Sequence, residues 1–229
     1  MRQPANASPG ATLRFGDDSK GTRRYRVLMS ARWVYILGFV AIALALAAGA
    51  LVLTDKDPVY RLSELASFGR HDSQDALIAA AAARHGVDPL LVKAVIWQES
   101  RFQPEKLGAH GERGLMQVTE PAAQDWVQAL GVETFVPEDL LDPKTNIEVG
   151  TWYLAQALQH WSRQEDPLPF ALGEYNAGRS RVKRWSGGAS MSAEELAKAM
   201  DIASTRAYVA AVRNRYEYYK DRGDTVSAP

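Results

Sequence analysis

Cysteine is absent from the 229 residues, and histidine occurs only four times. Without cysteine the chain cannot form a disulfide, ligate a metal through thiolates or carry a lipid on an N-terminal cysteine. The histidines are scattered, and none belongs to the H-E-x-x-H pair that is typical of zinc hydrolases. We therefore expect no metal site and no cofactor.

Net charge is also lacking, because 27 basic residues balance 27 acidic ones. The balance is uneven: residues 1–32 contain seven basic and two acidic groups, which leaves a net charge of −5 on the rest. The negative charge of residues 33–229 gives no support for binding of nucleic acid. Residues 1–30 are polar and have no apolar period, so they predict a disordered tail.

One long stretch lacks charge altogether. Residues 33–53 are uncharged over 21 positions, and roughly 20 apolar residues span a bilayer core as a helix. Arginines precede the stretch, so the positive-inside rule predicts a cytoplasmic N-terminus and an exported remainder. Two alternatives stay open: a cleaved signal peptide, with Ala48-Gly49-Ala50 as the cleavage site, and a buried helix of a soluble domain.

Strand-like alternation of useful length is missing, whereas helix start and stop signals recur from residue 73 onward. Asp88-Pro89 combines a capping carboxylate with proline at the first helical position. Ser192 and Glu195 form a capping box, and we also expect Ser73 and Asn146 as N-caps. The sequence therefore predicts a mostly α-helical domain, with helices over residues 73–85, 88–100, 119–130, from 146 to about 161, 169–176, from 192 and over about 205–220.

Glu99 occupies an unusual position in the predicted helix 88–100. It follows Val95 by four residues and Val92 by seven, which places it on the apolar face of the helix. Burial there disfavours the ionised carboxylate and raises its pKa, and the negative end of the helix dipole acts in the same direction. A carboxyl group that is protonated near neutral pH suits cleavage of a glycosidic bond. The alternative is that Glu99 simply ends the helix and faces solvent.

Two further segments carry polar groups suited to a ligand. Gly114-Leu115-Met116-Gln117 places an amide in a glycine-rich stretch, where backbone can approach a ligand closely. Tyr175-Asn176 places a phenol and an amide at a predicted helix end that Gly178 closes. For this second segment a plain C-cap with a core tyrosine is the alternative.

In this order, the segments resemble the catalytic domain of the soluble lytic transglycosylase family, which has a goose-type-lysozyme-like fold. The resemblance covers about residues 72–220. It implies a lysozyme-like helical domain that acts on the glycan strands of peptidoglycan. The matching segments are Glu99-Ser100-Arg101-Phe102-Gln103-Pro104, Gly114-Leu115-Met116-Gln117, Tyr175-Asn176-Ala177-Gly178 and Thr205-Arg206-Ala207-Tyr208-Val209.

The resemblance also implies roles for single residues. Glu99 matches the catalytic acid and base, while Gln117 and Tyr175 match residues that line the site. Substrate binding is expected at Ser100, Met116, Gln117, Tyr175 and Asn176, and for Ser100, Met116 and Asn176 a structural role stays open.

Three positions depart from the family pattern. Gly108, Thr119 and Ser204 stand where the family often has serine, methionine and glutamate, respectively. The departures concern glycan subsites and the preference for peptide stems, and they leave the acid itself unchanged.

The implied reaction requires one carboxyl group. Glu99 would protonate the oxygen between N-acetylmuramic acid and N-acetylglucosamine and then accept the proton of the muramyl 6-hydroxyl, which gives a 1,6-anhydro product. A lysozyme-type hydrolase is the first rival and would need a second carboxylate, for which Glu112, Asp125 and Glu174 are candidates. The second rival is a catalytically silent glycan-binding component of an envelope-spanning machine.

These patterns together predict an enzyme held at the bacterial inner membrane with its catalytic domain on the periplasmic side. No protein partner is indicated by the sequence. The expected organisation is a basic cytoplasmic tail over 1–32, a transmembrane helix over 33–53, a linker over 54–71, the catalytic domain over 72–222 and a C-terminal tail over 223–229.

Overall fold

The computed structural model describes residues 31–67 and 69–226, and these residues form helices joined by loops. Within this part of the chain the only β-structure consists of isolated bridges, so the predicted mostly α-helical class is confirmed. The disordered tail expected over residues 1–30 lies outside the described residues, and so do residues 227–229 of the C-terminal tail expected over 223–229. The elements are α1 (Ala31–Thr54), α2 (Pro58–Ala66), η1 (Arg70–Asp72), α3 (Asp75–His85), α4 (Pro89–Ser100), α5 (Glu120–Leu130), η2 (Pro137–Leu141), α6 (Pro143–His160), α7 (Leu168–Ala177), α8 (Arg179–Ser186), α9 (Ala193–Ala199) and α10 (Ala203–Arg222).

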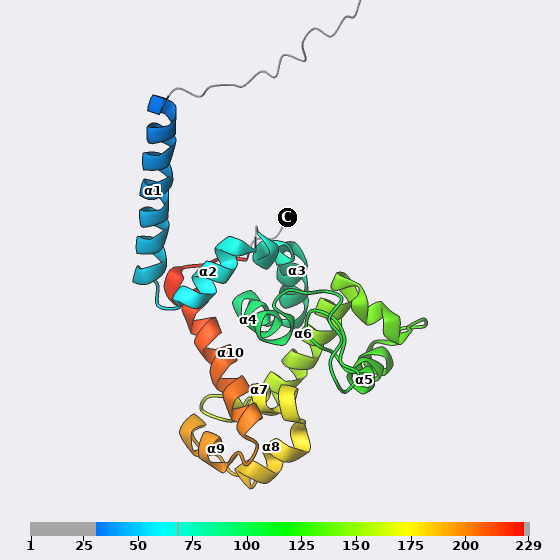
Figure 1. Cartoon of the computed structure of the whole chain (residues 1–229). Coiled ribbons are helices and arrows are strands. Elements are labelled where there is room, and N and C mark those ends of the chain that lie inside the picture. Colours follow the sequence, from blue (N-terminus) through cyan, green and yellow to red (C-terminus); the bar gives the residue numbers. More distant parts are fainter. Residues whose placement is uncertain (1–30, 68, 227–229) are drawn as a thin grey trace, which may run out of the picture. The chain divides into compact units, whose positions relative to one another are not determined.

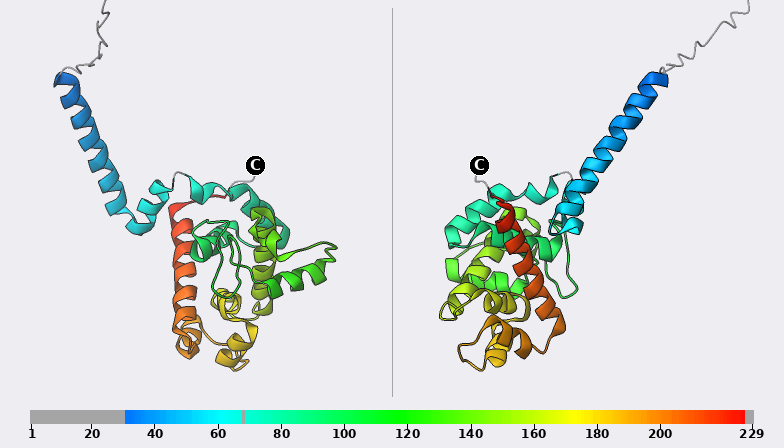
Figure 2. Two further views of the ribbon diagram at one scale, coloured as in Figure 1. Left: turned by 45° about the vertical axis from the view of Figure 1, so that its right-hand side comes forward. Right: turned by 90° about the vertical axis from the view of Figure 1, so that its left-hand side faces the viewer.

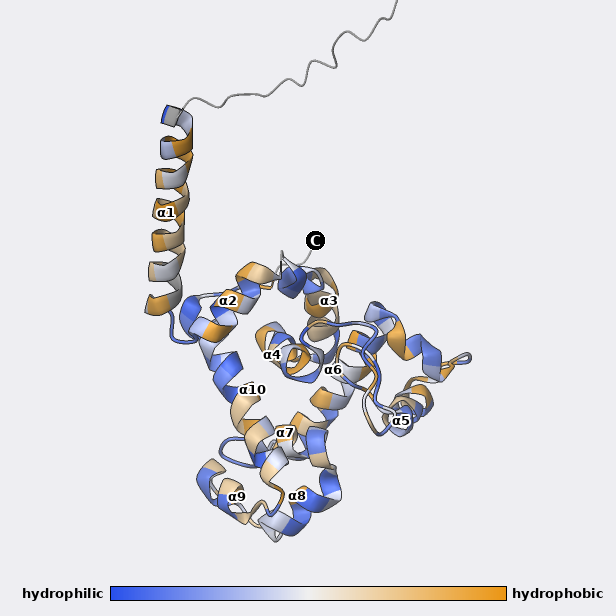
Figure 3. Ribbon diagram, in the orientation of Figure 1, coloured by the Kyte–Doolittle hydropathy of each residue, from blue (hydrophilic) through white to orange (hydrophobic). Residues whose placement is uncertain are grey.

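The chain divides into two compact units between Gly49 and Ala50. The first unit contains most of α1, whose hydrophobic residues extend around the whole helix (Figure 3). Its segment Arg32–Ala50 is long and apolar enough to cross a membrane. A signal sequence near an N-terminus has the same length and composition, so the helix by itself does not separate an anchor from a cleaved leader.

The second unit is built around α4. This helix lies among α2, α3, α6 and α10 (Figures 1 and 2), and it packs most closely against α10 and α3. Because most of α4 is apolar, its middle part is fully buried, from Leu91 to Ile96. The centre of the unit is completed by large buried side chains from the surrounding elements: Ile78, Leu115, Leu140, Ile147, Leu154, Phe170, Leu172 and Tyr219.

Several helix ends lie where the sequence predicted them. Asp88 caps α4 by accepting a hydrogen bond from the backbone N–H of Leu90 at 2.8 Å. Thr119 caps α5, and Ser192 begins α9 with the expected capping box.

Two predicted N-caps are wrong. Ser73 does not cap α3, which begins at Asp75, and its hydroxyl donates instead to the Arg70 carbonyl. Asn146 does not begin α6 either, because Asp142 caps that helix at Pro143. Asn146 is buried inside the first turns of α6, where it has another role at the site.

The segment expected as a linker, 54–71, contains α2 and the first two residues of η1. Tyr60 of α2 is 1% exposed, and its hydroxyl lies 3.0 Å from that of Tyr219 on α10. His71 is also buried and stacks on Tyr60. Much of this segment is therefore part of the packed second unit.

Candidate active site

Glu99 lies in the last turn of α4, directly before a sharp change of chain direction. The helix ends at Ser100, and the next two residues, Arg101 and Phe102, both have left-handed backbone angles, with φ of 55° and 58°. Such angles are uncommon for residues other than glycine, and here the buried Phe102 ring and a hydrogen bond from Lys106 Nζ to the Glu99 carbonyl hold the turn. The turn leaves Glu99 at the end of a rigid, buried helix.

The surroundings of Glu99 favour its neutral form. Burial is the largest influence and raises the pKa of Glu99 to about 7. The Tyr208 hydroxyl and the charge of Lys106 act in the opposite direction, while the negative charge of Glu112 raises this pKa further. The carboxyl can therefore exchange a proton near neutral pH, as a general acid and base must.

Two tyrosines approach this carboxyl from other helices. Tyr208 of α10 is 6% exposed, and its hydroxyl has no regular hydrogen bond among the described residues. The hydroxyl lies close enough to the Glu99 carboxyl to influence its pKa, but the two groups are not aligned as in a regular hydrogen bond. Burial and the charge of Glu99 hold the pKa values of Tyr208 and Tyr175 well above their usual range. Both phenols consequently remain neutral hydrogen-bond donors.

The Gly114–Gln117 segment is fixed to α6 by Asn146. The Asn146 Oδ1 accepts a hydrogen bond from the Met116 N–H at 2.7 Å, and its Nδ2 donates to the carbonyls of Arg113 and Leu140. Gly114 has a φ of 76°, and a Cβ there would lie 2.4 Å from the Leu140 carbonyl oxygen. The buried amide and the glycine together explain why this loop holds one conformation.

Tyr175 of α7 reaches the loop that carries Gln117. The Tyr175 hydroxyl donates to the Met116 carbonyl at 2.9 Å. Gln117 uses its Nε2 for hydrogen bonds to the carbonyls of Lys106 and Gly114, at 3.1 and 3.0 Å. Its Oε1 thereby stays available to accept a hydrogen bond from a ligand.

The other expected substrate-binding residues lie differently. Ser100 is 1% exposed and donates to the Ile96 carbonyl of its own helix, and Met116 is fully buried. Asn176 is exposed at the end of α7, and its Oδ1 accepts a hydrogen bond from the buried Thr205 hydroxyl at 2.8 Å. Ser100 and Met116 thus support the site from beneath, whereas Asn176 lies on its surface.

Tyr208 and Tyr153 are site residues whose contacts the sequence did not predict. Tyr208 belongs to the last matching motif, but only the crossing of α4 and α10 shows that it reaches Glu99. Tyr153 packs edge-to-face on Tyr175, with ring centroids 5.7 Å apart. A small cavity of about 70 Å³ lies beside both rings, and it is lined by Gln117, Val118, Thr119, Ala122, Tyr153 and Tyr175.

Two of the departures from the family pattern have a local structural explanation. A Cβ on Gly108 would lie 2.2 Å from Oε2 of Glu112, so the Glu112 carboxylate occupies the space that a serine side chain would need. That carboxylate accepts a hydrogen bond from the His110 N–H at 2.9 Å. Thr119, for its part, is the residue that caps α5.

The three candidate second carboxylates lie in different surroundings. Glu174 is 3% exposed and accepts hydrogen bonds from Trp161 Nε1 at 2.7 Å and from His160 Nδ1 at 2.8 Å. Asp125 is exposed on α5. Glu112 is the one whose charge acts on Glu99.

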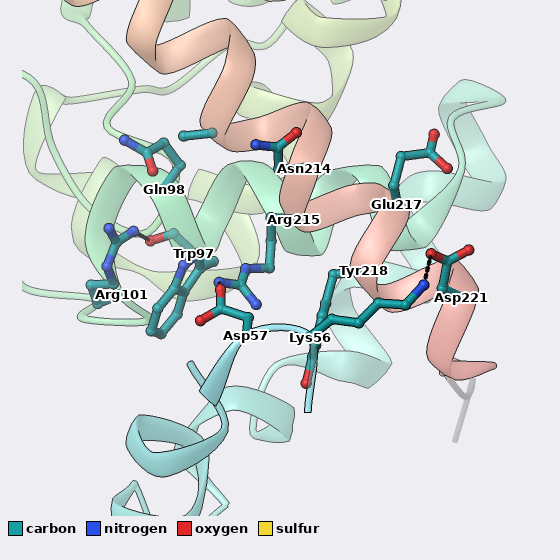
Figure 4. Close-up of a pocket in the computed structure, with 11 residues that line it drawn as sticks. Lys56, Asp57, Trp97, Gln98, Arg101, Asn214, Arg215, Glu217, Tyr218 and Asp221 are labelled. Atoms are coloured by element: carbon teal, nitrogen blue, oxygen red, sulfur yellow. Dashed lines mark hydrogen bonds and ion pairs between the residues drawn. The ribbon is translucent and has the colours of Figure 1, made fainter. Parts of the chain in front are cut away.

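A larger cavity of about 530 Å³ lies on another side of α4 (Figure 4). Arg215 dominates it: the guanidinium lies 3.6 Å from the ring centroid of Tyr60, and its Nη2 donates to Asp57 at 2.6 Å. Lys56 pairs with Asp221 at 2.8 Å in the same cavity. Because these contacts join residues 56–60 to α10, we interpret this region as a structural junction.

The family described as "Transglycosylase SLT domain" matches residues 76–197, which is more than half of the chain. The chain therefore belongs to this family.

Two curated relatives are also similar to this chain. Membrane-bound lytic murein transglycosylase F of Desulfosudis oleivorans is 37% identical over 153 residues, which are 63% of this chain and 30% of the relative. Soluble lytic murein transglycosylase of Escherichia coli K12 is 32% identical over 130 residues, which are 56% of this chain and 20% of the relative. The chain thus matches less than a third of the length of either relative.

Solved structures are similar to this fold as well. The 70 kDa soluble lytic transglycosylase of Escherichia coli matches with a TM-score of 0.59 and 29% identity, over 65% of this chain and 24% of that one. The complex of the 70 kDa soluble lytic transglycosylase with bulgecin A matches with a TM-score of 0.61 and 28% identity, over 69% of this chain and 26% of that one. The expected lysozyme-like helical domain is therefore confirmed.

Proposed function

We propose that this protein is a lytic transglycosylase that cleaves the glycan strands of peptidoglycan. The observation that carries the proposal is a half-buried carboxyl group, Glu99, with a pKa of about 7 beside two neutral tyrosines. Membership of the transglycosylase SLT domain family and the names of the relatives support the same activity.

In the proposed reaction Glu99 donates its proton to the oxygen between N-acetylmuramic acid and N-acetylglucosamine as the bond from that oxygen to the muramyl C1 breaks. The ionised Glu99 then accepts the proton of the muramyl 6-hydroxyl, whose oxygen forms the new bond to C1. The product is a 1,6-anhydromuramyl end, and no water is consumed. One carboxyl group serves as acid and then as base.

The neighbouring residues have supporting roles in this proposal. The Gln117 Oε1 and the exposed Asn176 are available to bind sugar hydroxyl or N-acetyl groups. Tyr175 and Tyr208 both remain neutral; the Tyr175 hydroxyl donates to the Met116 carbonyl, and the Tyr208 hydroxyl is available to donate to Glu99 or to the substrate. Ser100 and Met116 act from beneath the surface by holding the end of α4 and the Gly114–Gln117 loop in place.

A hydrolase remains the alternative that a specific observation supports. Glu112 is an ionised carboxylate whose pKa lies below its usual value, and its charge reaches Glu99. Such a carboxylate would serve an inverting mechanism if it held a water opposite the leaving group.

The products separate the two reactions. The full chain, purified in detergent, is incubated with purified sacculi, and the fragments are analysed by mass spectrometry. We expect 1,6-anhydro ends, which are lighter than reducing ends by one water. Reducing ends would show that the enzyme is a hydrolase. Absence of fragments at every pH would contradict both the transglycosylase and the hydrolase activity.

We further propose that α1 anchors the protein in the inner membrane as a single span, with residues after it in the periplasm. The length and composition of α1 support this, as do the arginines that precede it. A reporter active only outside the cytoplasm, fused after Pro229, should be active, and the protein should resist extraction from membranes by salt. A soluble product that begins near residue 51 would instead indicate a cleaved signal peptide.

A further inference from the structure

Helix α2 carries an apolar stripe, formed by Val59, Leu62 and Leu65, that is exposed in the described part of the chain. The three residues follow one another at intervals of three, and their exposed fractions are 78%, 59% and 46%. Such intervals bring side chains to one face of an α-helix. Single exposed apolar residues are common on soluble proteins, but three in helical register make a continuous face, and hydrophilic residues lie beside it on the same helix (Figure 3).

The other face of α2 is fixed to α10, so the helix cannot rotate to bury the stripe. Tyr60 is 1% exposed, and its hydroxyl lies 3.0 Å from that of Tyr219. Glu64 accepts hydrogen bonds from Arg222 on both carboxylate oxygens, at 2.8 and 2.9 Å. The stripe is therefore held toward the outside of the second unit.

Helix α2 follows the candidate membrane span almost directly. α1 ends at Thr54 and α2 begins at Pro58, and four residues extend over at most about 14 Å. The headgroup region outside the hydrocarbon core is roughly 5–8 Å deep on each side of a bilayer. If α1 spans the membrane, α2 consequently begins at or just outside the membrane surface. Apolar side chains of a helix at that level are stabilised by entering the boundary between headgroups and acyl chains.

We propose that the α2 stripe inserts into the surface of the membrane that α1 crosses, with α2 lying along that surface. The inference rests on the proposed anchoring by α1 and goes beyond it, because a single span leaves the second unit free to rotate about the connection at residues 55–57. A second contact fixes the face that this unit presents to the membrane. Arg61 and Glu64, the charged residues of α2, form an ion pair with each other, so the contact is apolar and should not require anionic lipids.

The absence of cysteine from the chain allows a label at a single chosen position. The full chain with Val59→Cys, Leu62→Cys or Leu65→Cys is labelled with a fluorophore and reconstituted into phosphatidylcholine vesicles. Quenching is measured with a nitroxide on the lipid near the headgroup and with iodide on both sides of the bilayer. The control is Glu133→Cys, an exposed position in the loop after α5.

The two quenchers should give opposite results at the stripe and at the control. Burial of one leucine side chain favours the inserted state by about tenfold or more. Iodide quenching at the stripe should therefore be about a tenth of that at Glu133→Cys. Quenching by the lipid nitroxide should be strong at the stripe and weak at the control.

A charge on the stripe tests the same contact by disruption. Leu62→Asp should expel the stripe from the lipid, so a label at Val59→Cys should lose most of its lipid quenching and become accessible to iodide. Leu130→Asp introduces the same charge at a leucine of α5 that is 53% exposed, and it should leave the label at residue 59 unchanged. Because both leucines are exposed, both variants should remain folded, which circular dichroism checks.

Two results would overturn the inference. Strong iodide quenching at all three stripe positions would show that the face lies in water. Protection from both quenchers would show that protein covers the face, and dependence of this protection on the protein-to-lipid ratio would identify a second copy of the chain. In both cases the protein stays anchored, whereas failure of the anchoring proposal gives a soluble product that begins near residue 51.

Discussion

Glu99 and Glu174 are two glutamates near the ends of buried helices, and they differ in the hydrogen-bond donors that surround the carboxyl group. Glu174 accepts hydrogen bonds from His160, Trp161 and Arg179, so its charge is compensated where it is buried. Glu99 is approached by the imperfectly aligned Tyr208 hydroxyl, and burial raises its pKa to about 7.

The difference shows that one glutamate can stabilise the fold while another, in the same domain, is able to transfer a proton. A buried carboxylate with several donors stabilises the elements that supply them, because charge-assisted hydrogen bonds are strong. A buried carboxyl without such donors costs stability but can release and accept a proton near neutral pH. The comparison therefore predicts that the same substitution has opposite consequences at the two positions.

The largest expected effect is on activity at Glu99. Glu99→Gln keeps the size of the side chain but cannot transfer the proton, so fragment release from sacculi should fall by at least about a hundredfold. The variant should remain folded, which circular dichroism checks. Activity within about tenfold of wild type would show that another group is the acid.

The same group should make stability depend on pH. Its folded pKa, about 7, lies above the ordinary 4.5. Below that ordinary value the carboxyl is protonated in both the folded and the unfolded chain. As pH rises toward 7 the unfolded chain releases the proton first, so the folded state loses stability, and above 7 the loss is complete.

The size of this effect is at most about 3 kcal/mol, and it is smaller to the extent that water reaches the partly buried carboxyl. Glu99→Gln should remove the penalty. Urea unfolding of both proteins at about pH 4, 6 and 8 measures it, and a difference in free energy that does not grow over this range would contradict the assigned pKa.

Glu174→Gln should give the opposite pattern. The amide replaces one acceptor oxygen and removes the charge shared by His160, Trp161 and Arg179, so we expect a loss of about 1–3 kcal/mol in the free energy of unfolding. Cleavage per folded molecule should stay within about threefold of wild type. A loss of activity like that of Glu99→Gln, with stability unchanged, would make Glu174 part of the chemistry.

Much of this comparison could be predicted from the sequence, because its signals are local. The apolar period placed Glu99 on the inner face of its helix, and the Asp88-Pro89 pair located the start of that helix correctly. The same kind of signal failed at Asn146: an asparagine near a helix start resembles a cap, but two of its three hydrogen bonds reach Met116 and Arg113, which lie 30 and 33 residues away in sequence, and the third reaches Leu140.

Contacts between distant segments account for what the sequence could not predict. Tyr208 lies more than a hundred residues after Glu99, and only the packing of α10 on α4 brings the two together. Likewise Arg215 has the composition of an exposed helix residue, yet it is 8% exposed because four aromatic rings and Asp57 surround it. Helix α8 was missed because its sequence is strongly polar and short.

The smallest expected effect concerns the charge next to Glu99. Glu112 raises the pKa of Glu99, and Glu112→Gln removes that charge while its amide oxygen can still accept the hydrogen bond from the His110 N–H. The pKa of Glu99 should then fall, and since activity needs the protonated acid, the loss of activity with rising pH should begin at lower pH. The expected displacement is about half a pH unit or less.

Gly108→Ala tests the same point by geometry, because the added Cβ would lie 2.2 Å from Oε2 of Glu112 and must displace that carboxylate. Both variants should move the alkaline limb of the kcat/KM profile in the same direction, whereas Glu133→Gln, which removes an exposed carboxylate from the loop after α5, should leave it in place. If Glu112→Gln instead abolishes cleavage at every pH and wild-type products carry reducing ends, Glu112 activates water. The contrast would then be between two carboxylates that share the chemistry and one, Glu174, that holds the fold.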